Sequence, residues 1–478
     1  MTDTICALAT APGGALGIIR ISGPQSLEIL SRVFRGSGNA LTYPANTIHY
    51  GHLVPLLQEG SGEVTPHKVT PHEILDEVMV SVFRAPHSYT GEDSVEISCH
   101  GSRYILNKVL ELLIACGCRM ANPGEYTMRA YLNGKMDLSQ AEAVADLIAS
   151  TNKATHQMAM SQLRGGISTE LGHLREQLLR LTSLLELELD FSDHEDLEFA
   201  DRSELLDLTK KIDNHITRLS KSFKTGQALK QGIPVAIVGK TNVGKSTLLN
   251  ALLKDDRAIV SDVHGTTRDT IEDTIDINGI TFRFIDTAGI RQTTDEVEQI
   301  GISRTYSAID KARIVLWLID AEPTSEEVQE MHERCKDKSL IIIFNKIDII
   351  SNRSTESLFS HLSSLTSHLL SITSHLLSIS AKFGTNLSNL ESTIYQTADI
   401  PSLQENDIII SNARHYDALT RAHAHLERVL NGLNNELSGD LLSEDLHLIL
   451  DTLAEITGGQ ITPNEVLGNI FKNFCVGK

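Results

Sequence analysis

The chain has 478 residues, which is too long for a single hydrophobic core, so we expect about three domains. Its 41% of hydrophobic and 22% of charged residues are ordinary for a globular protein, and a formal net charge of −20 argues against a protein that coats nucleic acid through Lys and Arg. The sequence has no run of the ~18 apolar residues that a membrane span needs and no basic signal-peptide segment at its start, so we expect a cytoplasmic protein without a membrane partner.

The first 120 residues carry strand and turn signals. Strand-like segments are 18–22, 78–83 and 95–101, and apolar residues at helical spacing follow in 103–116. The Gly-, Pro- and polar-rich segment 58–72 is typical of a surface loop. These patterns predict a compact N-terminal α+β domain over residues 1–120.

Helical patterns flank a central α/β segment. In residues 121–232, Leu, Glu and Arg recur at helical spacing, as in the series Leu174, Leu178, Leu181 and Leu185. Residues 233–395 alternate apolar runs with helical patterns, which is the βαβ order of a doubly wound sheet. The expected strands are 233–238, 282–285, 314–319, 340–344 and 379–380. Since residues 396–478 are helical again, we expect the α/β domain to be inserted into a helical domain.

Two biased segments raise the question of metal binding. The acidic segment 190–196 interrupts the helical pattern, and a solvated helix junction is favoured there over a metal site. Segments 360–366, 367–373 and 374–380 are three closely similar seven-residue repeats with one His each. Their Ser-rich composition favours a tandem duplication that lengthens a loop or helix over a row of metal ligands.

A phosphate-binding motif follows the first strand of the α/β segment. It reads Gly239-Lys240-Thr241-Asn242-Val243-Gly244-Lys245-Ser246, and a helical pattern begins at Thr247. A Gly-rich turn between a strand and a helix directs backbone N–H groups and a helix N-terminus at one point, which suits a polyphosphate. We expect Asn242, Val243, Gly244 and Thr247 to line this loop, Lys245 to reach the terminal phosphates, and the Ser246 hydroxyl to hold Mg²⁺.

Three further motifs stand at predicted strand ends in the order found in GTPases. Asp286-Thr287-Ala288-Gly289 offers a carboxylate for Mg²⁺ and an N–H for the γ-phosphate. In Asn345-Lys346-Ile347-Asp348, the Asp348 carboxylate can accept two hydrogen bonds from guanine, which adenine cannot offer. Ser380-Ala381-Lys382 would place backbone N–H groups near the guanine O6. The set predicts GTP rather than ATP.

Two positions bear on hydrolysis. Thr266 and Thr267 lie where a switch loop supplies a Thr to Mg²⁺, and Thr267 is favoured for that bond. Ile290 stands where Ras-like GTPases place the Gln that orients the attacking water, so either hydrolysis is very slow or another group positions the water. The acidic segment 295–301 offers such groups, with a solvated helix start as the alternative, and Asn242 could lend a carbonyl oxygen to a monovalent cation.

Further segments are shared with one known family. They are Asp3-Thr4-Ile5-x-Ala7-x-Ala9-Thr10, Gly17-x-x-x-x-Ser22-Gly23, the block 123–138 that begins Pro-Gly-Glu-Tyr-Thr, and the C-terminal Phe471-x-x-Phe474-Cys475-Val476-Gly477-Lys478. With these, the chain resembles the MnmE (TrmE) family of tRNA modification GTPases over nearly its whole length. The resemblance implies a multidomain α/β protein with an N-terminal α+β tetrahydrofolate-binding and dimerisation domain, a helical domain and an inserted Ras-like P-loop GTPase domain over 233–395. The repeat 360–380 departs from the family pattern.

The resemblance also implies a function. The family adds an aminomethyl-type group to C5 of wobble uridine in tRNA, with 5-formyl- or methylene-tetrahydrofolate as one-carbon donor. It acts as a homodimer in a heterotetramer-type complex with MnmG (GidA), which carries FAD and NADH. Its GTPase is stimulated by K⁺ and by pairing of two G domains; by position, Asn242 and Thr266 would contact K⁺, and Glu298 would place the attacking water. The alternative is a regulatory GTPase in ribosome assembly or RNA maturation.

Candidate folate and thiol residues complete the expectations. Arg20, Glu125, Arg129, Asn133 and Lys478 are the candidate folate residues, because a pterin needs a paired donor and acceptor and a glutamate tail needs a cation. The alternative is that they are structural polar residues at a domain junction. Cys475 matches the family's terminal cysteine and is a candidate catalytic residue beside Lys245 and Glu298, with a buried structural thiol as the alternative. The other five cysteines are expected to be reduced structural thiols.

Overall fold

The computed structural model describes most of the chain. The described residues are 3–55, 74–190, 202–254, 273–285, 298–349, 375–400, 407–435, 437–459, 464–472, 474–475 and 477. The chain divides into a first unit, Met1–Ala149 with Ala159–Asn214 and Ala418–Lys478, and a second unit, Ser150–Met158 with His215–Asp417. Helices α5 (Lys153–Leu163), α7 (Arg202–Gln231) and α14 (Ala413–Asn434) each have residues in both units.

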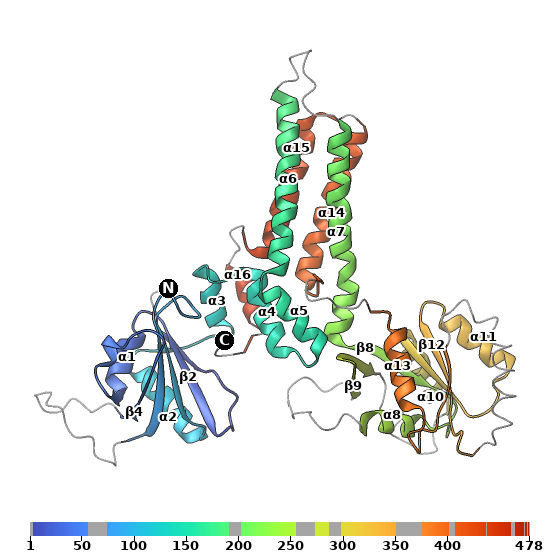
Figure 1. Ribbon diagram of the computed structural model, residues 1–478, viewed down its shortest axis with the longest axis horizontal. Coiled ribbons are helices and arrows are strands. Elements are labelled where there is room, and N and C mark those ends of the chain that lie inside the picture. The colour runs from blue at the N-terminus through green and yellow to red at the C-terminus, as the bar shows by residue number, and fades with distance from the viewer. Residues whose placement is uncertain are drawn as a thin grey trace, which may run out of the picture. The chain divides into compact units, whose positions relative to one another are not determined.

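The N-terminal part of the first unit is a seven-stranded sheet in the order β3-β4-β5-β6-β2-β1-β7 (Figure 1). Its strands are β1 (Ile5–Leu8), β2 (Leu16–Ser22), β3 (Phe34–Gly36), β4 (Thr47–Leu53), β5 (Asp76–Phe83), β6 (Ser94–His100) and β7 (Arg119–Met120). All neighbours are antiparallel except β1 and β7. Alternate strand residues are buried because one sheet face packs on helices α1 (Ser26–Val33) and α2 (Arg103–Ala115) in a common core. A short 3-10 helix, Ala40–Thr42, follows β3.

Three predicted strands and one predicted helix of this region are confirmed as β2, β5, β6 and α2. The predicted loop 58–72 lies outside the described residues.

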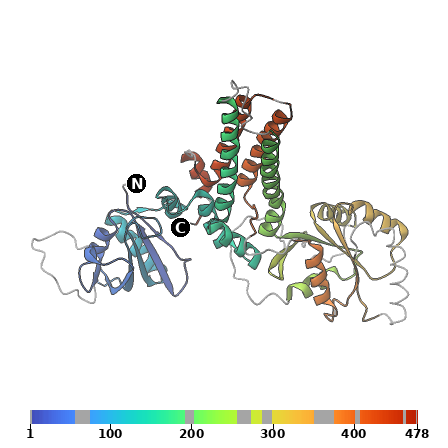
Figure 2. The ribbon, with the colours of Figure 1, turned by 45° about the horizontal axis from the view of Figure 1, so that its top comes forward.

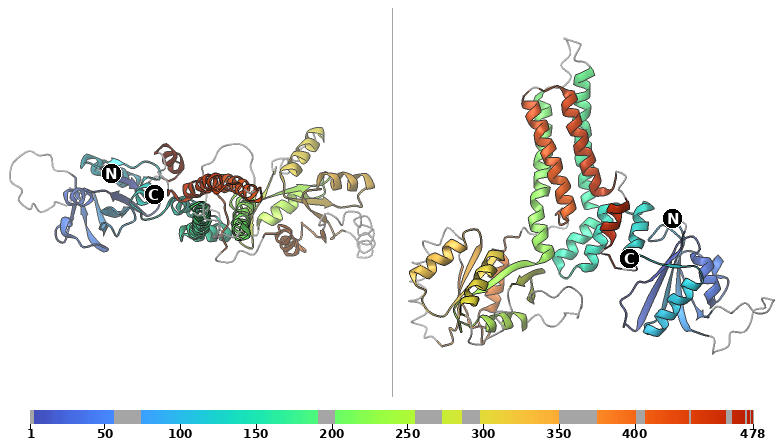
Figure 3. Two further views of the ribbon diagram at one scale, coloured as in Figure 1. Left: turned by 90° about the horizontal axis from the view of Figure 1, so that it is seen from above. Right: turned by 180° about the vertical axis from the view of Figure 1, so that it is seen from behind.

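The remaining helices of the first unit form its helical part. They are α3 (Glu125–Leu132), α4 (Leu138–Ala149), α6 (Gly166–Asp190), α15 (Gly439–Thr457) and α16 (Asn464–Phe471), with parts of α5, α7 and α14. The predicted series from Leu174 to Leu185 is fully buried on α6. Figures 1 and 3 show α6 beside α15, whose own stripe from Leu442 to Ile456 is buried. The long amphipathic helices are therefore confirmed, while the acidic segment after Asp190 lies outside the described residues.

The second unit contains a six-stranded sheet in the order β13-β12-β11-β8-β10-β9 (Figure 2). Its strands are β8 (Ile233–Val238), β9 (Asp273–Ile277), β10 (Ile280–Phe284), β11 (Ile314–Ile319), β12 (Ser339–Phe344) and β13 (His375–Ser378). All neighbours are parallel except β9 and β10. Helices α8 (Lys245–Lys254) and α13 (Leu387–Thr397) contribute to the core on one face, and α10 (Glu298–Lys311) and α11 (Ser325–Arg334) to the core on the other. This is the expected doubly wound α/β arrangement.

The structure corrects the prediction at the sheet's two edges. The last strand is His375–Ser378, not 379–380, so the third seven-residue repeat forms a strand instead of lengthening a loop or helix. Leu376 and Leu377 pack on opposite faces of the sheet, so both are apolar. The sequence of this short strand therefore lacks the alternation of apolar and polar residues by which a half-buried strand is recognised. At the other edge, β9 was missed, although Asn278-Gly279 after an alternating segment is a strong hairpin signal. Repeats 360–366 and 367–373 lie outside the described residues.

A helix that crosses a bilayer needs about 20 predominantly apolar residues. Within the described ranges, no helix is long and apolar enough to cross a membrane.

Candidate functional site

The loop between β8 and α8 needs glycine at both of its motif positions. Gly239 has φ of 152° and Gly244 has φ of 105°, values that L side chains rarely adopt. A Cβ on Gly239 would overlap the Leu318 carbonyl oxygen, and a Cβ on Gly244 would overlap Nδ2 of Asn345. The two glycines therefore let the loop approach the neighbouring strand ends closely.

Lys245 opens α8 and turns back over the loop. Its Nζ donates to the carbonyl oxygens of Gly239 at 2.7 Å and of Lys240 at 2.8 Å. Burial lowers the pKa of Lys245. Ser246 and Thr247 follow in the first turn of α8 and, with Lys382, line a hollow of about 460 Å³. A helix start, a lysine and a hollow thus meet at the carboxyl end of β8, where parallel α/β sheets bind ligands.

The Asn345 side chain joins three of the predicted motifs. Asn345 follows β12 and is only 2% exposed. Its Nδ2 donates to the Val243 carbonyl at 2.9 Å, and its Oδ1 accepts from the Ala381 N–H at 3.0 Å. Beside it, the Ser380 hydroxyl donates to Oδ1 of Asp348 at 2.6 Å. The phosphate loop, the predicted guanine motif and the last loop are therefore held together by direct hydrogen bonds.

Two acidic residues that sequence reasoning missed hold lysines of these motifs. Lys346, which has φ of 64°, pairs through Nζ with Oδ2 of Asp320 at 2.7 Å. Lys240 pairs with Oε1 of Glu327 at 2.6 Å, and this bond lowers the pKa of Glu327. Glu327 also closes a capping box with Thr324 at the start of α11. Asp320 directly follows β11, so its place at a strand end was the available signal.

Part of the predicted nucleotide site lies outside the described residues. This holds for Thr266, Thr267, Asp286, Thr287, Ala288, Gly289 and Ile290. Glu298 is the first residue of α10, and its side chain is likewise not described. Asn242 has φ of 64°, a left-handed conformation that Asn tolerates better than most residues. The Mg²⁺ and K⁺ assignments of these residues stay predictions.

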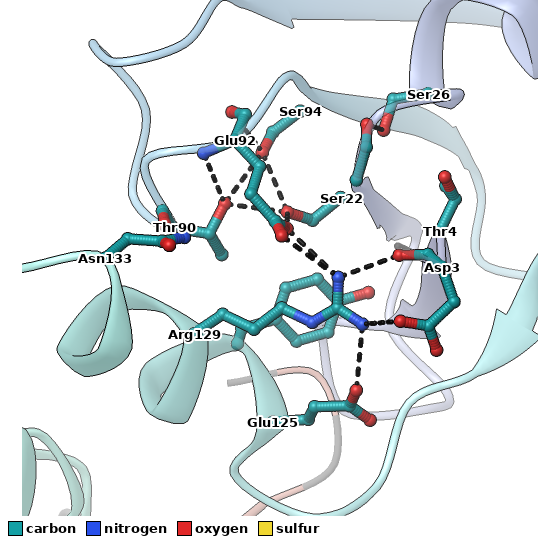
Figure 4. A network of polar contacts seen from close by, with 12 residues as sticks. Asp3, Thr4, Ser22, Ser26, Thr90, Glu92, Ser94, Glu125, Arg129 and Asn133 are labelled. Atoms are coloured by element: carbon teal, nitrogen blue, oxygen red, sulfur yellow. Dashed lines mark hydrogen bonds and ion pairs between the residues drawn. The ribbon is translucent and has the colours of Figure 1, made fainter. Parts of the chain in front are cut away.

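In the first unit, a buried arginine gathers carboxylates from three segments (Figure 4). Arg129 on α3 is 1% exposed. Its Nη2 donates to Asp3 Oδ1 at 2.9 Å and to Glu125 Oε1 at 3.0 Å, and its Nη1 donates to Glu92 Oε2 at 3.1 Å. Glu125, itself 3% exposed, also accepts from Nη2 of Arg119 at 2.6 Å. We call Asp3, Glu92, Arg119, Glu125 and Arg129 the Arg129 network.

The charged groups of the Arg129 network shift the pKa values of their neighbours. Burial raises the pKa of Glu125, but the hydrogen bonds from Arg119, from the Asn122 N–H and from Arg129 outweigh it and leave the pKa below its ordinary value. The hydrogen bond from Arg119 is the main cause of the lowered pKa of Asp3. Burial lowers the pKa of Arg129, and the bonds to Glu125 and Glu92 more than restore it. The lowered pKa values of Asp3 and Glu125 and the raised pKa of Arg129 each favour the charged form of these three groups.

The other candidate folate residues lie around the same helix. Arg20 on β2 donates through Nε and Nη2 to Oε1 of Glu96 at 2.9 and 2.7 Å. Its guanidinium carbon lies 5.6 Å from the ring centroids of both Tyr89 and Tyr126. Asn133 donates through Nδ2 to the Thr90 carbonyl at 2.7 Å. The structure thus brings Arg20, Glu125, Arg129 and Asn133 together, while Lys478 lies outside the described residues.

These contacts separate the candidates by role. Glu125 and Arg129 bond to protein partners and to each other, which favours a supporting role for them over direct contact with a ligand. Asp3, Glu92 and Arg119 were missed because nothing in their local sequence marks them as partners of Arg129.

The C-terminal tail is held against the same part of the first unit. Gly477 is buried with φ of 97°, and a Cβ there would overlap the Leu8 carbonyl oxygen. Its own carbonyl accepts from Nη1 of Arg20 at 3.3 Å, and the Cys475 carbonyl accepts from the Gly124 N–H at 3.3 Å. Cys475 is exposed, so the alternative of a buried thiol is wrong for it. The other five cysteines are buried free thiols, as expected.

Replacing Arg129 tests the network. Arg129→Met leaves the buried Glu125 and the partly buried Glu92 with one cation fewer, so we expect a loss of about 3–5 kcal/mol in the free energy of unfolding of the N-terminal sheet. Hydrogen exchange of the β1, β2 and α3 peptides along a urea series measures this loss. In the control Arg180→Met, the lost partner Glu204 is 53% exposed, so less than about 1 kcal/mol is expected. Equal, small losses in both variants would contradict the account.

Comparison with known proteins places both units in one family. The model of the MnmE helical domain matches residues 138–475, and the model of the GTP-binding protein TrmE N-terminus matches residues 4–135. The chain is 53% identical to a tRNA modification GTPase MnmE of Phocaeicola vulgatus, over 100% of this chain and 99% of the relative. It is 52% identical to a protein of the same name from Bacteroides thetaiotaomicron and 47% identical to one from Porphyromonas gingivalis, over 100% of this chain and 99% and 98% of those relatives. The chain therefore belongs to the MnmE family of tRNA modification GTPases.

Proposed function

We propose that the chain hydrolyses GTP as one component of a cytoplasmic complex that adds an aminomethyl-type group to C5 of wobble uridine in tRNA. Family membership over the whole length supports the role in tRNA modification. The single structural observation that carries the nucleotide part is the Asn345 side chain, which bonds to Val243 and to Ala381 and so assembles the motifs at one sheet edge.

Different described residues would contact the phosphates and the base of GTP. The backbone of the β8–α8 loop and the α8 N-terminus would hold the phosphates, and Lys245 would exchange its bonds to Gly239 and Lys240 for phosphate oxygens. Asp348, positioned by Ser380, would accept from the N1–H and the 2-amino group of guanine. Ser246 fits as a hydroxyl ligand of Mg²⁺ at the loop, with Thr267 and Asp286 as the further proposed ligands. Bound Mg²⁺ supplies charge neutralisation of the phosphates.

Water activation needs a group other than residue 290. Ile290 cannot orient water, and the family resemblance gives that role to Glu298, the first residue of α10. Asn242 and Thr266 would hold K⁺, which would supply the positive charge of an arginine finger when two G domains of a homodimer pair. Asn242 has a left-handed backbone conformation, which is a sparsely populated conformation of the kind found at functional sites.

The folate donor is proposed to bind near Arg20 in the first unit. The Arg20 guanidinium lies beside the partly exposed ring of Tyr89, and together they offer a cation for a glutamate tail and a flat surface for a pterin. The Arg129 network would hold helix α3, whose Tyr126 hydroxyl donates to the Arg20 carbonyl, in place beside this site. The exposed thiol of Cys475 and, through the tail, Lys478 would complete it. The partner MnmG would contribute FAD and NADH.

Asp348→Asn tests the guanine contact. The substitution replaces a charged acceptor of two hydrogen bonds by an amide, so we expect GTP affinity to fall about 30- to 150-fold, the range for about 2–3 kcal/mol. Titration with a fluorescent GTP analogue measures the change.

The control for this variant is Asp320→Asn, the same change at the end of β11. Asp320 pairs with Lys346 at a site where both side chains are about one-third exposed, so a change of less than about threefold is expected. Because the amide introduced by Asp348→Asn could donate to a 2-oxo group, xanthosine triphosphate should bind that variant better than GTP does. Equal affinities of the two variants for GTP would contradict the assignment of Asp348.

The salt dependence of turnover tests the proposed K⁺ role. We expect GTP turnover in KCl to exceed turnover in NaCl at equal ionic strength by at least about tenfold, a small fraction of what an arginine finger supplies. The rates are measured as phosphate release at several protein concentrations, since pairing of G domains also makes them concentration-dependent. Equal, very slow rates in both salts would contradict K⁺-stimulated pairing.

Deleting the gene tests the role in modification. We expect tRNA from the deletion strain to lose the C5 substituent of wobble uridine, and the intact chain to restore it, as read by mass spectrometry of tRNA nucleosides. Unchanged wobble uridine in the deletion strain would favour the alternative, a regulatory GTPase without modification chemistry.

A further inference from the structure

The hairpin β9–β10 lies between the two segments that are predicted to sense the γ-phosphate. Segment 265–269 precedes β9 in the sequence, and Asp286–Gly289 follows β10. The hairpin turn, Asn278-Gly279, has φ of 55° and 82°, the positive values of a tight two-residue turn that matches strand twist. The register runs without a break from Ile280 opposite Ile277 to Phe284 opposite Asp273. Both predicted switches are therefore attached to the open end of one well-defined hairpin.

The closed end of this hairpin is bonded to the start of α5. The Ala154 N–H donates to the Gly279 carbonyl at 3.0 Å, and Nδ2 of Asn152 donates to Oγ1 of Thr281 at 2.7 Å. Asn152 is 8% exposed. A Cβ on Gly279 would lie 2.9 Å from Cβ of Lys153, so the turn passes close to the helix backbone. Ala154 is buried in the same core as β10, which explains why Ser150–Met158 group with the second unit.

The other end of α5 is bonded to α4. Nε2 of Gln162 donates to the Ser139 carbonyl at 2.8 Å, and Nε2 of Gln140 donates to the Leu163 carbonyl at 2.9 Å. Gln162 is 6% exposed. Helix α4 in turn shares a small core with α3, in which Leu138 and Ala141 pack with Met128 and Tyr131. Helix α5 is thus bonded to the hairpin at its start and to α4 at its end, and α4 packs on the helix that carries Glu125 and Arg129.

We propose that Asn152 and Thr281 are positioning residues that couple the nucleotide state of the second unit to α5, and through α4 to α3. The proposal rests on GTP binding and hydrolysis as proposed above. If the GTP and GDP states hold the hairpin differently, the bonds of its turn to Asn152 and Ala154 differ in strength between the states. By linkage, α5 is then stabilised to different degrees by the two nucleotides. A contact that only packs the two elements together predicts the same α5 stability with either nucleotide.

Thr281→Val and Asn152→Ser separate these two possibilities. Val keeps the shape of Thr281 and removes only its hydroxyl acceptor. Ser keeps an oxygen for the bond that Oδ1 of Asn152 accepts from the Thr155 N–H, and so keeps the cap of α5, but it lacks the amide donor. The matched control is Thr274→Val, the same change at an exposed position of β9. Because Val keeps the packing of Thr281 and Ser keeps the cap of α5, a changed response of either variant is not explained by unfolding.

The readout is hydrogen exchange of the α4 and α5 peptides in the intact chain, loaded with GDP or with a non-hydrolysable GTP analogue. In the unaltered chain, we expect the protection of α5 amides to differ between the nucleotides by about fivefold, the size for one net hydrogen bond. Thr281→Val and Asn152→Ser should each bring the ratio close to one, and Thr274→Val should keep it. The double variant should lose no more than either single one, since both remove the same bond.

Two results would overturn the coupling. One is equal protection of α5 with both nucleotides in the unaltered chain, and the other is a full difference that persists in Thr281→Val and Asn152→Ser. The β8–α8 loop peptide reports loading in the same experiment. If no guanine nucleotide protects that peptide, the proposed function fails and the coupling fails with it, whereas a protected loop with an unresponsive α5 overturns the coupling alone.

Discussion

The proposed nucleotide site depends on one buried amide group, the side chain of Asn345. Asn345 can bond to Val243 and to Ala381 at the same time because its amide carries a donor and an acceptor, and because it is almost fully shielded from water. Neither Asp nor Leu at this position could make both bonds. Gly244 belongs to the same arrangement, since any side chain there would displace the Asn345 amide. Three loops that are far apart in the sequence thereby form one surface.

In the first unit, buried charged side chains hold separate segments of the chain together. Placing Arg129 and Glu125 in the interior costs desolvation, and the structure offsets that cost by surrounding Arg129 with carboxylates from the N-terminus, a loop and its own helix. Such a network favours one arrangement of these segments. The C-terminal tail is held by neighbouring residues, since Arg20 of β2 donates to the Gly477 carbonyl and the Gly124 N–H donates to the Cys475 carbonyl, while the Cys475 thiol stays exposed. The position of the tail is thus set by contacts with residues near the start of the chain.

Sequence reasoning succeeded where the determinants are local. The β8–loop–α8 motif, the buried leucines of α6 and the strands β11 and β12 follow from apolar runs, glycine spacing and helical periodicity. It failed where partners are distant: Glu92 has no local mark of its bond to Arg129, and Lys240 none of its bond to Glu327. The strand β13 was misplaced because its two leucines face opposite cores. For the hairpin β9–β10, the Asn278-Gly279 signal was present and was overlooked.

Competition between nucleotides tests the central claim most directly, because the arrangement built around Asn345 and Asp348 is proposed to be a guanine site. Fluorescent GDP bound to the purified chain in Mg²⁺ would be displaced by unlabelled GTP or ATP, with the displacing concentration measured for each. The account predicts that GTP acts at a concentration at least about 100-fold lower than ATP, since adenine leaves Asp348 without its two donors. Displacement by GTP and ATP at the same concentration would contradict it.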